Sequence, residues 1–144
     1  MELDEYHRIA AVQDGHWWYR SMRALLEQEL LPYVPTGGRF LDAGGASGAT
    51  GGWLAAHGRL VVSDVELLGL SYLARTVPGV AGVGADIAAQ PVPDATFDLV
   101  LCVTVLNQQA VVDPPAAVRE LARVTRPGGV VCVLEPGVRR AVRT

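Results

Sequence analysis

Apolar positions follow a helical period through the first part of the chain. From Leu3 to about Val34 they recur at helical spacing and include Ile9, Val12, Met22, Leu25, Leu26 and Leu30. Gly15 predicts a break into two helices, and Pro32 and Pro35 predict the end of the second. We therefore expect residues 1–36 to form an N-terminal helical cap that ends in a turn.

From residue 39 the pattern changes to short apolar runs that alternate with helical segments. The runs with the character of buried strands are 39–43, 59–64, 80–85, 97–103 and 130–134. Helical segments are expected at 50–57, at 66–76 and after Asp113-Pro114, where an N-cap carboxylate precedes a proline. The last of these is predicted to bury Val118, Leu121, Ala122 and Val124.

This alternation predicts parallel β-α-β units with right-handed crossovers. The expected fold class is α/β, a doubly wound, mostly parallel Rossmann-like sheet of about five strands with the helical segment before it. The sheet domain is expected to occupy residues 37–144.

Composition excludes several kinds of protein. With 50% hydrophobic and 19% charged residues among 144, the chain can bury a core and is not typical of disorder. A net charge of −3 argues against nucleic acid as a partner. The apolar runs are far shorter than the ~20 residues of a membrane span, and the acidic N-terminus does not resemble a signal peptide. Cys102 and Cys132 lie in apolar runs, as reduced thiols do, so a cytoplasmic location is expected.

A glycine-rich loop follows the first apolar run. Gly44-Gly45-Ala46-Ser47-Gly48 stands between a predicted strand and a predicted helix, which is the context in which such a loop binds a ligand. Gly44 permits a sharp turn, while the small Ala46 and Gly48 let a ligand approach the helix N-terminus, whose N–H groups favour anions. A turn without a ligand is the alternative.

Two aspartates end the next two predicted strands. Asp64 lies 20 residues after Gly44, where a carboxylate can accept both ribose hydroxyls of a nucleoside cofactor; capping the next helix is the alternative. Asp86 can accept the exocyclic amine of adenine while Ile87 packs on the ring; a solvated loop aspartate is the alternative. No cluster of His and Cys has metal-ligand spacing, so no metal is expected.

Together these segments resemble a known enzyme family. The run 40–48, the run Phe97-Asp98-Leu99-Val100 with Val105-Leu106, and the run 121–129 resemble signatures of class I S-adenosylmethionine-dependent methyltransferases (type 11/12-like domain). The resemblance covers roughly residues 40–135 and implies S-adenosyl-L-methionine as cofactor. It implies that Asp42 and the glycine loop hold the methionine end, with Asp64 on the ribose and Asp86 near the adenine. The expected cofactor-binding residues are Trp17, Asp42, Gly44, Gly45, Ala46, Gly48, Asp64, Val65, Asp86, Ile87 and Val103.

The segment 15–20, with Trp17, Trp18 and Tyr19, is similar to an aromatic segment ahead of the glycine loop in one branch of that family. Aromatic rings there would cover the cofactor, exclude water or offer a π-face to the sulfonium cation. The alternative is that the two tryptophans only fix a helix to the sheet. No general base is identified, and Tyr19, His16 and Asn107 are candidates for positioning the acceptor.

The chain departs from the family pattern at three places. Ala46 replaces the usual second glycine and tolerates a narrower range of backbone angles. Asn107-Gln108 stands where many relatives carry Glu-His, which removes one candidate base without excluding methyl transfer. The family fold continues with two more strands and a helix, so 130–134 is expected to be an open edge. A longer protein, a dimer partner or the folded-back tail would cover it.

The leading functional hypothesis is a small-molecule methyltransferase in which an oxygen, nitrogen or carbon of the acceptor attacks the cofactor methyl by SN2 displacement. Its partners would be the acceptor and a second copy in a homodimer formed through the open edge, without nucleic acid or membrane. The alternative is a non-catalytic S-adenosylmethionine-binding module or partner subunit. A closed pocket lined by Trp17, Tyr19 and Asn107 would favour the enzyme. A nicotinamide dinucleotide site is disfavoured because the loop does not match G-x-G-x-x-G.

Overall fold

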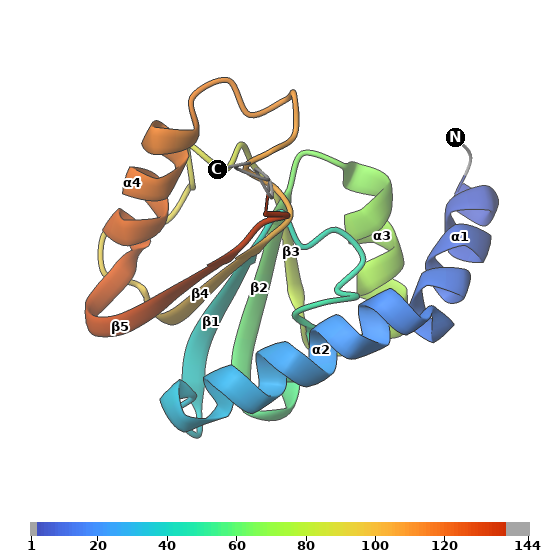
Figure 1. The fold of residues 1–144 in the computed structure, drawn as a ribbon, viewed down its shortest axis with the longest axis horizontal. Helices are drawn as coiled ribbons and strands as arrows, with labels where there is room; N and C mark the ends of the chain where they lie inside the picture. The colour runs from blue at the N-terminus through green and yellow to red at the C-terminus, as the bar shows by residue number, and fades with distance from the viewer. Residues whose placement is uncertain (1–2, 138–144) are drawn as a thin grey trace, which may run out of the picture.

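The computed structural model describes residues 3–137, in which helices lie on both faces of a parallel sheet (Figure 1). The elements in chain order are α1 (Leu3–Gly15), α2 (Trp17–Leu30), η1 (Leu31–Tyr33), β1 (Gly38–Ala43), η2 (Gly52–Ala56), β2 (Gly58–Asp64), α3 (Leu67–Thr76), β3 (Ala81–Gly84), β4 (Phe97–Val103), α4 (Pro114–Val124) and β5 (Thr125–Leu134). Among these residues no helix has both the length and the apolar character needed to cross a bilayer.

Local sequence signals explain most of the element boundaries. The helical N-terminal segment divides at Gly15, and His16 starts α2 by accepting a hydrogen bond from Trp18 N–H on Nδ1. Asp113 starts α4 in the same way, because its Oδ1 accepts the N–H of Ala116 at 3.0 Å. The predicted breaks at these places are confirmed.

Two predicted elements differ in the structure. The helix expected at 50–57 is a short 3-10 turn, because Gly51 and Gly52 disfavour an α-helix. The last strand begins at Thr125 rather than at residue 130. Thr125 already pairs with Phe97, and the register then shifts so that Val130 pairs with Leu99. The segment 126–129 is therefore an irregular part of the strand rather than a separate turn.

The sheet has the strand order β3-β2-β1-β4-β5, and every pair is parallel. The winding direction reverses between β1 and β4, and the carboxyl ends of the strands open a crevice at such a point. The predicted α/β fold, with five parallel strands behind an N-terminal helical segment, is confirmed. The division of the chain at residues 36 and 37 stays a prediction.

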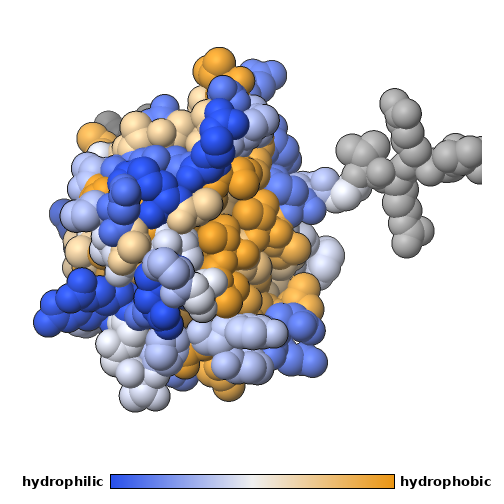
Figure 2. Space-filling model, turned by 90° about the vertical axis from the view of Figure 1, so that its left-hand side faces the viewer, coloured by the Kyte–Doolittle hydropathy of each residue, from blue (hydrophilic) through white to orange (hydrophobic). Residues whose placement is uncertain are grey.

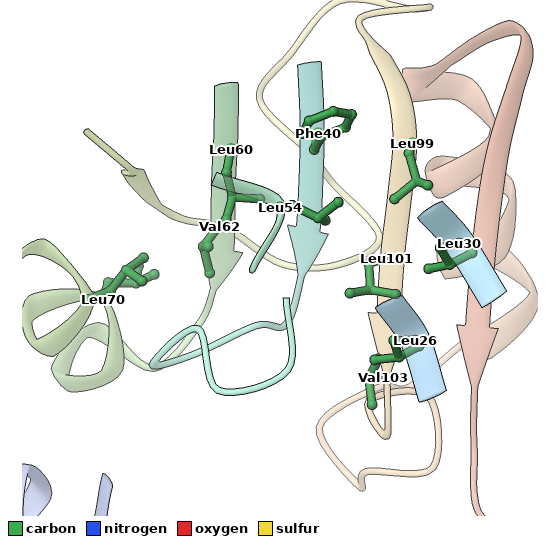
Figure 3. Packing of buried hydrophobic residues seen from close by; sticks show 11 residues of the cluster. Leu26, Leu30, Phe40, Leu54, Leu60, Val62, Leu70, Leu99, Leu101 and Val103 are labelled. Carbon is green, nitrogen blue, oxygen red and sulfur yellow. The ribbon is translucent and has the colours of Figure 1, made fainter. Parts of the chain in front are cut away.

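Two apolar clusters fill the two faces of the sheet. On one face, Leu26 and Leu30 of α2 pack with Leu54 of η2 against the strands (Figure 3). On the other face, α4 buries residues 117, 121 and 124. Val118 is 41% exposed and Ala122 is also exposed, because each follows a buried position by one residue and is rotated by about 100° around the helix. Their predicted burial was wrong.

The strand β5 is an outer strand of the sheet, as predicted for the last apolar run. Val131 and Val133 are 36% and 41% exposed on it. Figure 2 shows a continuous apolar area on the side of the molecule where β5 and α4 lie. Among residues 3–137, no further strand pairs with the outer edge of β5, which carries these apolar side chains.

Candidate functional site

Two adjoining hollows lie where β1, β2 and β4 end. The first is lined by Gly44, Asp64, Val65, Ala85, Asp86, Ile87, Val105, Gln108, Ala110 and Val111. The second is lined by Tyr6, Gln13, Trp18, Tyr19, Gly44, Gly45, Ala46, Ser47, Ala49, Thr50, Val103, Thr104 and Gln108. Gly44 and Gln108 line both, so the hollows are contiguous. Their cavity volumes, about 60 and 190 Å³, are smaller than the roughly 300–1,000 Å³ of typical small-molecule sites.

The glycine loop turns sharply between the two hollows. Gly44 has φ +77°, and a Cβ there would lie 2.5 Å from a methyl carbon of Val105. Ala46 also lies in the left-handed region, at φ +44°, and its N–H donates to Asp64 Oδ2 at 2.9 Å. The alanine that replaces the usual glycine therefore has a strained backbone conformation, which its hydrogen bond to Asp64 helps to stabilise.

Gly48 has a packing role in the structure. Its φ is +81°, and a Cβ there would lie 2.8 Å from Leu73 Cδ1 of α3. Gly48 lines neither hollow, and its expected contact with the cofactor stays a prediction.

Asp42 is a fully buried carboxylate behind the loop, and it lines neither hollow. Its two oxygens have no hydrogen-bond partner among the described residues. Added Cβ atoms on Gly45 and Gly51 would lie 2.3 and 2.2 Å from its Oδ2, so a larger residue at either position would require the Asp42 side chain to move. Burial, and secondarily the charge of Asp64, raises the pKa of Asp42 from 3.8 to about 7. A buried acceptor without a donor is suited to a cationic or N–H-bearing ligand group.

Asp64 connects the loop to β2. Its Oδ2 holds Ala46 N–H and its Oδ1 accepts Glu66 N–H at 2.8 Å. Glu66, rather than Asp64, caps α3 by accepting Leu68 N–H at 3.1 Å. A carboxylate offers about four lone-pair sites, so Asp64 retains acceptor capacity toward the first hollow, which it lines beside Val65.

Asp86 and Ile87 lie together in the wall of the first hollow. The Asp86 Oδ1 accepts Ala88 N–H at 2.8 Å, and Ile87 is buried. Val105 and Val111 complete an apolar wall near them. The hollow thus pairs carboxylates with an apolar surface, as binding of a nucleoside requires.

The N-terminal helices supply aromatic side chains to the second hollow. Trp18 and Tyr19 line it, whereas the Trp17 side chain is 70% exposed and lines neither hollow. Trp18 rather than Trp17 therefore lies at the hollow, and a contact of Trp17 with the cofactor stays a prediction. The capping bond of His16 fixes where α2 begins, and one residue of difference rotates a side chain by about 100°.

Tyr6 of α1 was not expected at the site. It lines the second hollow and hydrogen-bonds Ser47 of the glycine loop. An added Cβ on Gly69 of α3 would lie 2.7 Å from its hydroxyl, so α1, α3 and the loop meet here. Burial raises the pKa of the Tyr6 phenol. No local motif marks Tyr6, because its contacts lie about forty to sixty residues away in the sequence.

The segment after β4 forms the wall shared by the hollows. Thr104 has φ +54°, and Gln108 lines both hollows, while the neighbouring Asn107 is exposed and lines neither. Gln108 therefore lies at both hollows although it is exposed as well, and the positioning role of Asn107 stays a prediction. Glu135, also unexpected, accepts the N–H groups of Val105 and Leu106 on Oε1, at 2.9 and 2.8 Å.

Comparison with protein families identifies the arrangement. A family model described as "Methyltransferase domain" matches residues 41–133, which include the glycine loop, Asp64 and Asp86. The chain belongs to the class I S-adenosylmethionine-dependent methyltransferases. The family resemblance expected from the sequence is confirmed, and the family implies S-adenosylmethionine as cofactor.

Curated relatives of this methyltransferase domain carry different names. A demethylmenaquinone methyltransferase of Mycobacterium sp. (strain KMS) is 32% identical over 145 residues, covering 98% of this chain and 58% of the relative. A malonyl-[acyl-carrier protein] O-methyltransferase of Halorhodospira halophila is 34% identical, covering 89% of this chain and 43% of the relative. The chain thus spans about half the length of the curated relatives it matches.

Solved structures show the same fold. SAM-bound CalS10, an amino pentose methyltransferase from Micromonospora echinaspora, has a TM-score of 0.74 at 24% identity over 92% of this chain and 56% of that one. The [4+2]-cyclase SpnF has a TM-score of 0.69 at 25% identity, covering 81% of this chain and 44% of that one.

Proposed function

We propose that the chain binds S-adenosylmethionine in the two contiguous hollows and presents it to a small-molecule methyl acceptor. The supporting observation is that Asp64 and Asp86 line the first hollow, while the glycine loop separates it from a second one. A nucleoside with a polar side arm would need such a pair of adjoining spaces. The expected ribose, adenine and methionine ends then follow the order Asp64, Asp86 and the loop with Asp42.

Asp42 gives a test of fit for the methionine end. It is a buried carboxylate whose oxygens have no partner in the described part of the chain, and a Cβ added at Gly45 or Gly51 would collide with it. Such a group is costly unless a donor reaches it, directly or through water. The α-ammonium group of a bound methionine moiety would supply that donor, so the residues present fit the cofactor.

S-adenosylmethionine, when bound, supplies a methyl group on an electrophilic sulfonium. The contribution of the chain is to hold and orient the reactants and to exclude water. Tyr19 lines the second hollow together with Trp18 and Tyr6, which makes it our preferred candidate for positioning the acceptor. His16 caps α2 and Asn107 is exposed, so neither is proposed further.

The second candidate is a module that binds the cofactor without methyl transfer. SpnF, a cyclase by its description, has this fold at 25% identity, so the fold does not by itself imply methyl transfer. The Asn107-Gln108 sequence in place of Glu-His also favours this candidate. Methyl transfer from labelled cofactor to a panel of phenols, amines and carboxylates would separate the candidates. Binding without transfer to any acceptor would favour the module.

The binding test is calorimetric titration of the chain with S-adenosylmethionine and S-adenosylhomocysteine. We expect micromolar affinity, and a loss of about tenfold or more in Asp64→Ala, because a hydrogen bond to a charged group is worth roughly 1.5–3 kcal/mol. Asp4→Ala, an exposed aspartate in the first turn of α1, is the matched control. Absence of binding to folded wild-type protein would contradict the proposal.

We also propose that a second copy of the chain pairs along β5, and that the protein works in the cytoplasm. The outer position of β5 and its exposed valines support the first proposal. Two free cysteines, Cys102 and Cys132, support a reducing location.

A further inference from the structure

An ion pair on α4 holds the connection between β3 and β4. The Arg123 guanidinium donates to the carbonyl oxygens of Gln90 and Val92, at 3.0 Å each, and to Asp94 Oδ1 at 2.8 Å. It also donates to the two carboxylate oxygens of Glu120, at 2.6 and 2.8 Å. All these acceptors but Glu120 belong to the β3–β4 connection.

The same pair reaches Asp86 through one buried side chain. Glu120 Oε1 accepts Gln90 N–H at 2.8 Å, and Gln90 Nε2 donates to the carbonyl oxygen of Asp86 at 3.0 Å. Gln90 is only 6% exposed. The turn from Asp86 to Gln90 is closed further by the Asp86 carboxylate, which accepts Ala88 N–H. The orientation of the Asp86 carboxylate therefore depends on a turn that α4 anchors.

This arrangement is more than a surface ion pair. The Arg123 and Glu120 side chains are 33% and 14% exposed, so solvent screens them only in part. The hydrogen bond from Arg123 lowers the pKa of Glu120, which keeps that carboxylate ionised. Arginine can reach carbonyl and carboxylate oxygens from several N–H groups in one plane, and lysine cannot.

We propose that Glu120 and Arg123 are positioning residues that aim the Asp86 carboxylate at the exocyclic amine of the cofactor's adenine, and so set the preference of the site for adenine. This rests on the proposed function, in which Asp86 lies at the adenine end. It assigns a part in cofactor selection to α4, whose Glu120 and Arg123 line neither hollow.

The test compares S-adenosylhomocysteine with S-inosylhomocysteine, in which a carbonyl oxygen replaces the amine. That oxygen would face a carboxylate, so we expect the wild type to prefer the adenosyl compound by about tenfold. Arg123→Lys should reduce the preference to about twofold, because it should weaken the binding of the adenosyl compound and leave the binding of the inosyl compound unchanged. Arg119→Lys, on the exposed side of the same helix, is the matched control and should keep the wild-type ratio.

A double-mutant cycle separates positioning from general support. Asp86→Asn should abolish the preference, and adding Arg123→Lys to it should leave the ratio of the two dissociation constants unchanged, since both act through one group. If Arg123→Lys instead weakens the binding of both compounds equally, the ratio of their dissociation constants stays at the wild-type value and the inference is overturned.

A second variant tests the same inference in case the first one does not fold. Should Arg123→Lys unfold, Glu120→Gln keeps an acceptor for Gln90 N–H while removing the charge that orients Arg123, and the same loss of preference is expected. If the wild type binds S-adenosylhomocysteine and S-inosylhomocysteine equally well, this inference alone is overturned. Wild type that is folded and binds neither compound overturns the proposed function as well.

Discussion

At the scale of the residue, Asp42 is a buried carboxyl group whose ionisation in the folded state is costly. It is 1% exposed, without a hydrogen-bond partner in the described residues, and its pKa is raised to about 7. In the unfolded chain the same carboxyl ionises near 3.8. Between about pH 4 and pH 7 the folded state therefore binds a proton that the unfolded state has lost. Through this group the free energy of unfolding falls as pH rises across that window.

Asp42→Asn should remove this pH dependence. The contribution of Asp42 is on the order of 4 kcal/mol between about pH 4 and pH 8, so the variant should gain stability over the wild type as pH rises. Urea unfolding at several pH values in the absence of cofactor measures the difference.

Asp98→Asn is the matched control for this measurement. The N–H of Arg39, with Arg126, lowers the pKa of Asp98, so its stabilising effect is complete above about pH 4 and is lost as pH falls. The difference between Asp98→Asn and wild type should therefore stay constant from about pH 5 to pH 8. A parallel pH profile for Asp42→Asn and wild type would show that Asp42 ionises normally.

At the scale of the element, the end of β5 fixes the segment that follows β4. The Glu135 carboxylate accepts the N–H groups of Val105 and Leu106, and Leu134 O accepts the N–H of Thr104. Val105 in turn packs on Gly44. The wall common to the two hollows is thus held by a strand that lines neither of them.

Glu135→Ala should destabilise the protein and weaken binding in both hollows. Each N–H left without a partner costs roughly 1–3 kcal/mol when buried. Glu135→Gln keeps an acceptor oxygen and should cost about 1 kcal/mol or less. Urea unfolding gives the stability difference, and titration with adenosine and with S-adenosylhomocysteine gives the effect on each hollow. Equal stability of the Ala and Gln variants would show that these hydrogen bonds contribute nothing.

The elements were predicted well where a local signal exists. Buried parallel strands are continuous apolar runs, and β4 was predicted with its observed bounds, 97–103. Gly15, His16 and Asp113 mark helix ends by backbone chemistry that acts within a few residues. The rotation of a helix about its axis has no such marker, because the tertiary packing decides it. For that reason Trp17 was chosen where Trp18 lies, and Val118 was placed in the core.

At the scale of the whole molecule, the site is assembled from distant segments. Tyr6 and Glu135 are separated by almost the whole chain and reach the same region through tertiary contacts, so no spacing in the sequence announces them. The acidic residues at strand ends could be predicted because parallel strands end at one edge of the sheet. The strand order also leaves β5 at an edge, where the apolar area of Figure 2 lies.

Pairing along β5 should make the protein self-associate. We expect light scattering to report a dimer for the wild type and a monomer for Val131→Lys, because a charge on an edge strand opposes strand pairing. Val12→Lys makes the same change at an exposed valine on α1 and should remain a dimer. A stable wild-type monomer at all concentrations would contradict the proposed homodimer.

The hydrogen bond from Ala46 N–H to Asp64 links residues of the two hollows, so binding in one hollow should affect binding in the other. The Asp64 carboxylate holds the loop at Ala46, which has a left-handed backbone conformation. A ribose that hydrogen-bonds to Asp64 would change the position of that carboxylate and so of the loop. A methionine moiety that binds to the loop would in the same way change the position of the Asp64 carboxylate. Adenosine and free methionine, given as separate fragments, should therefore show heterotropic cooperativity. The factor by which each changes the affinity of the other must be the same, and Asp64→Asn should reduce that factor toward one.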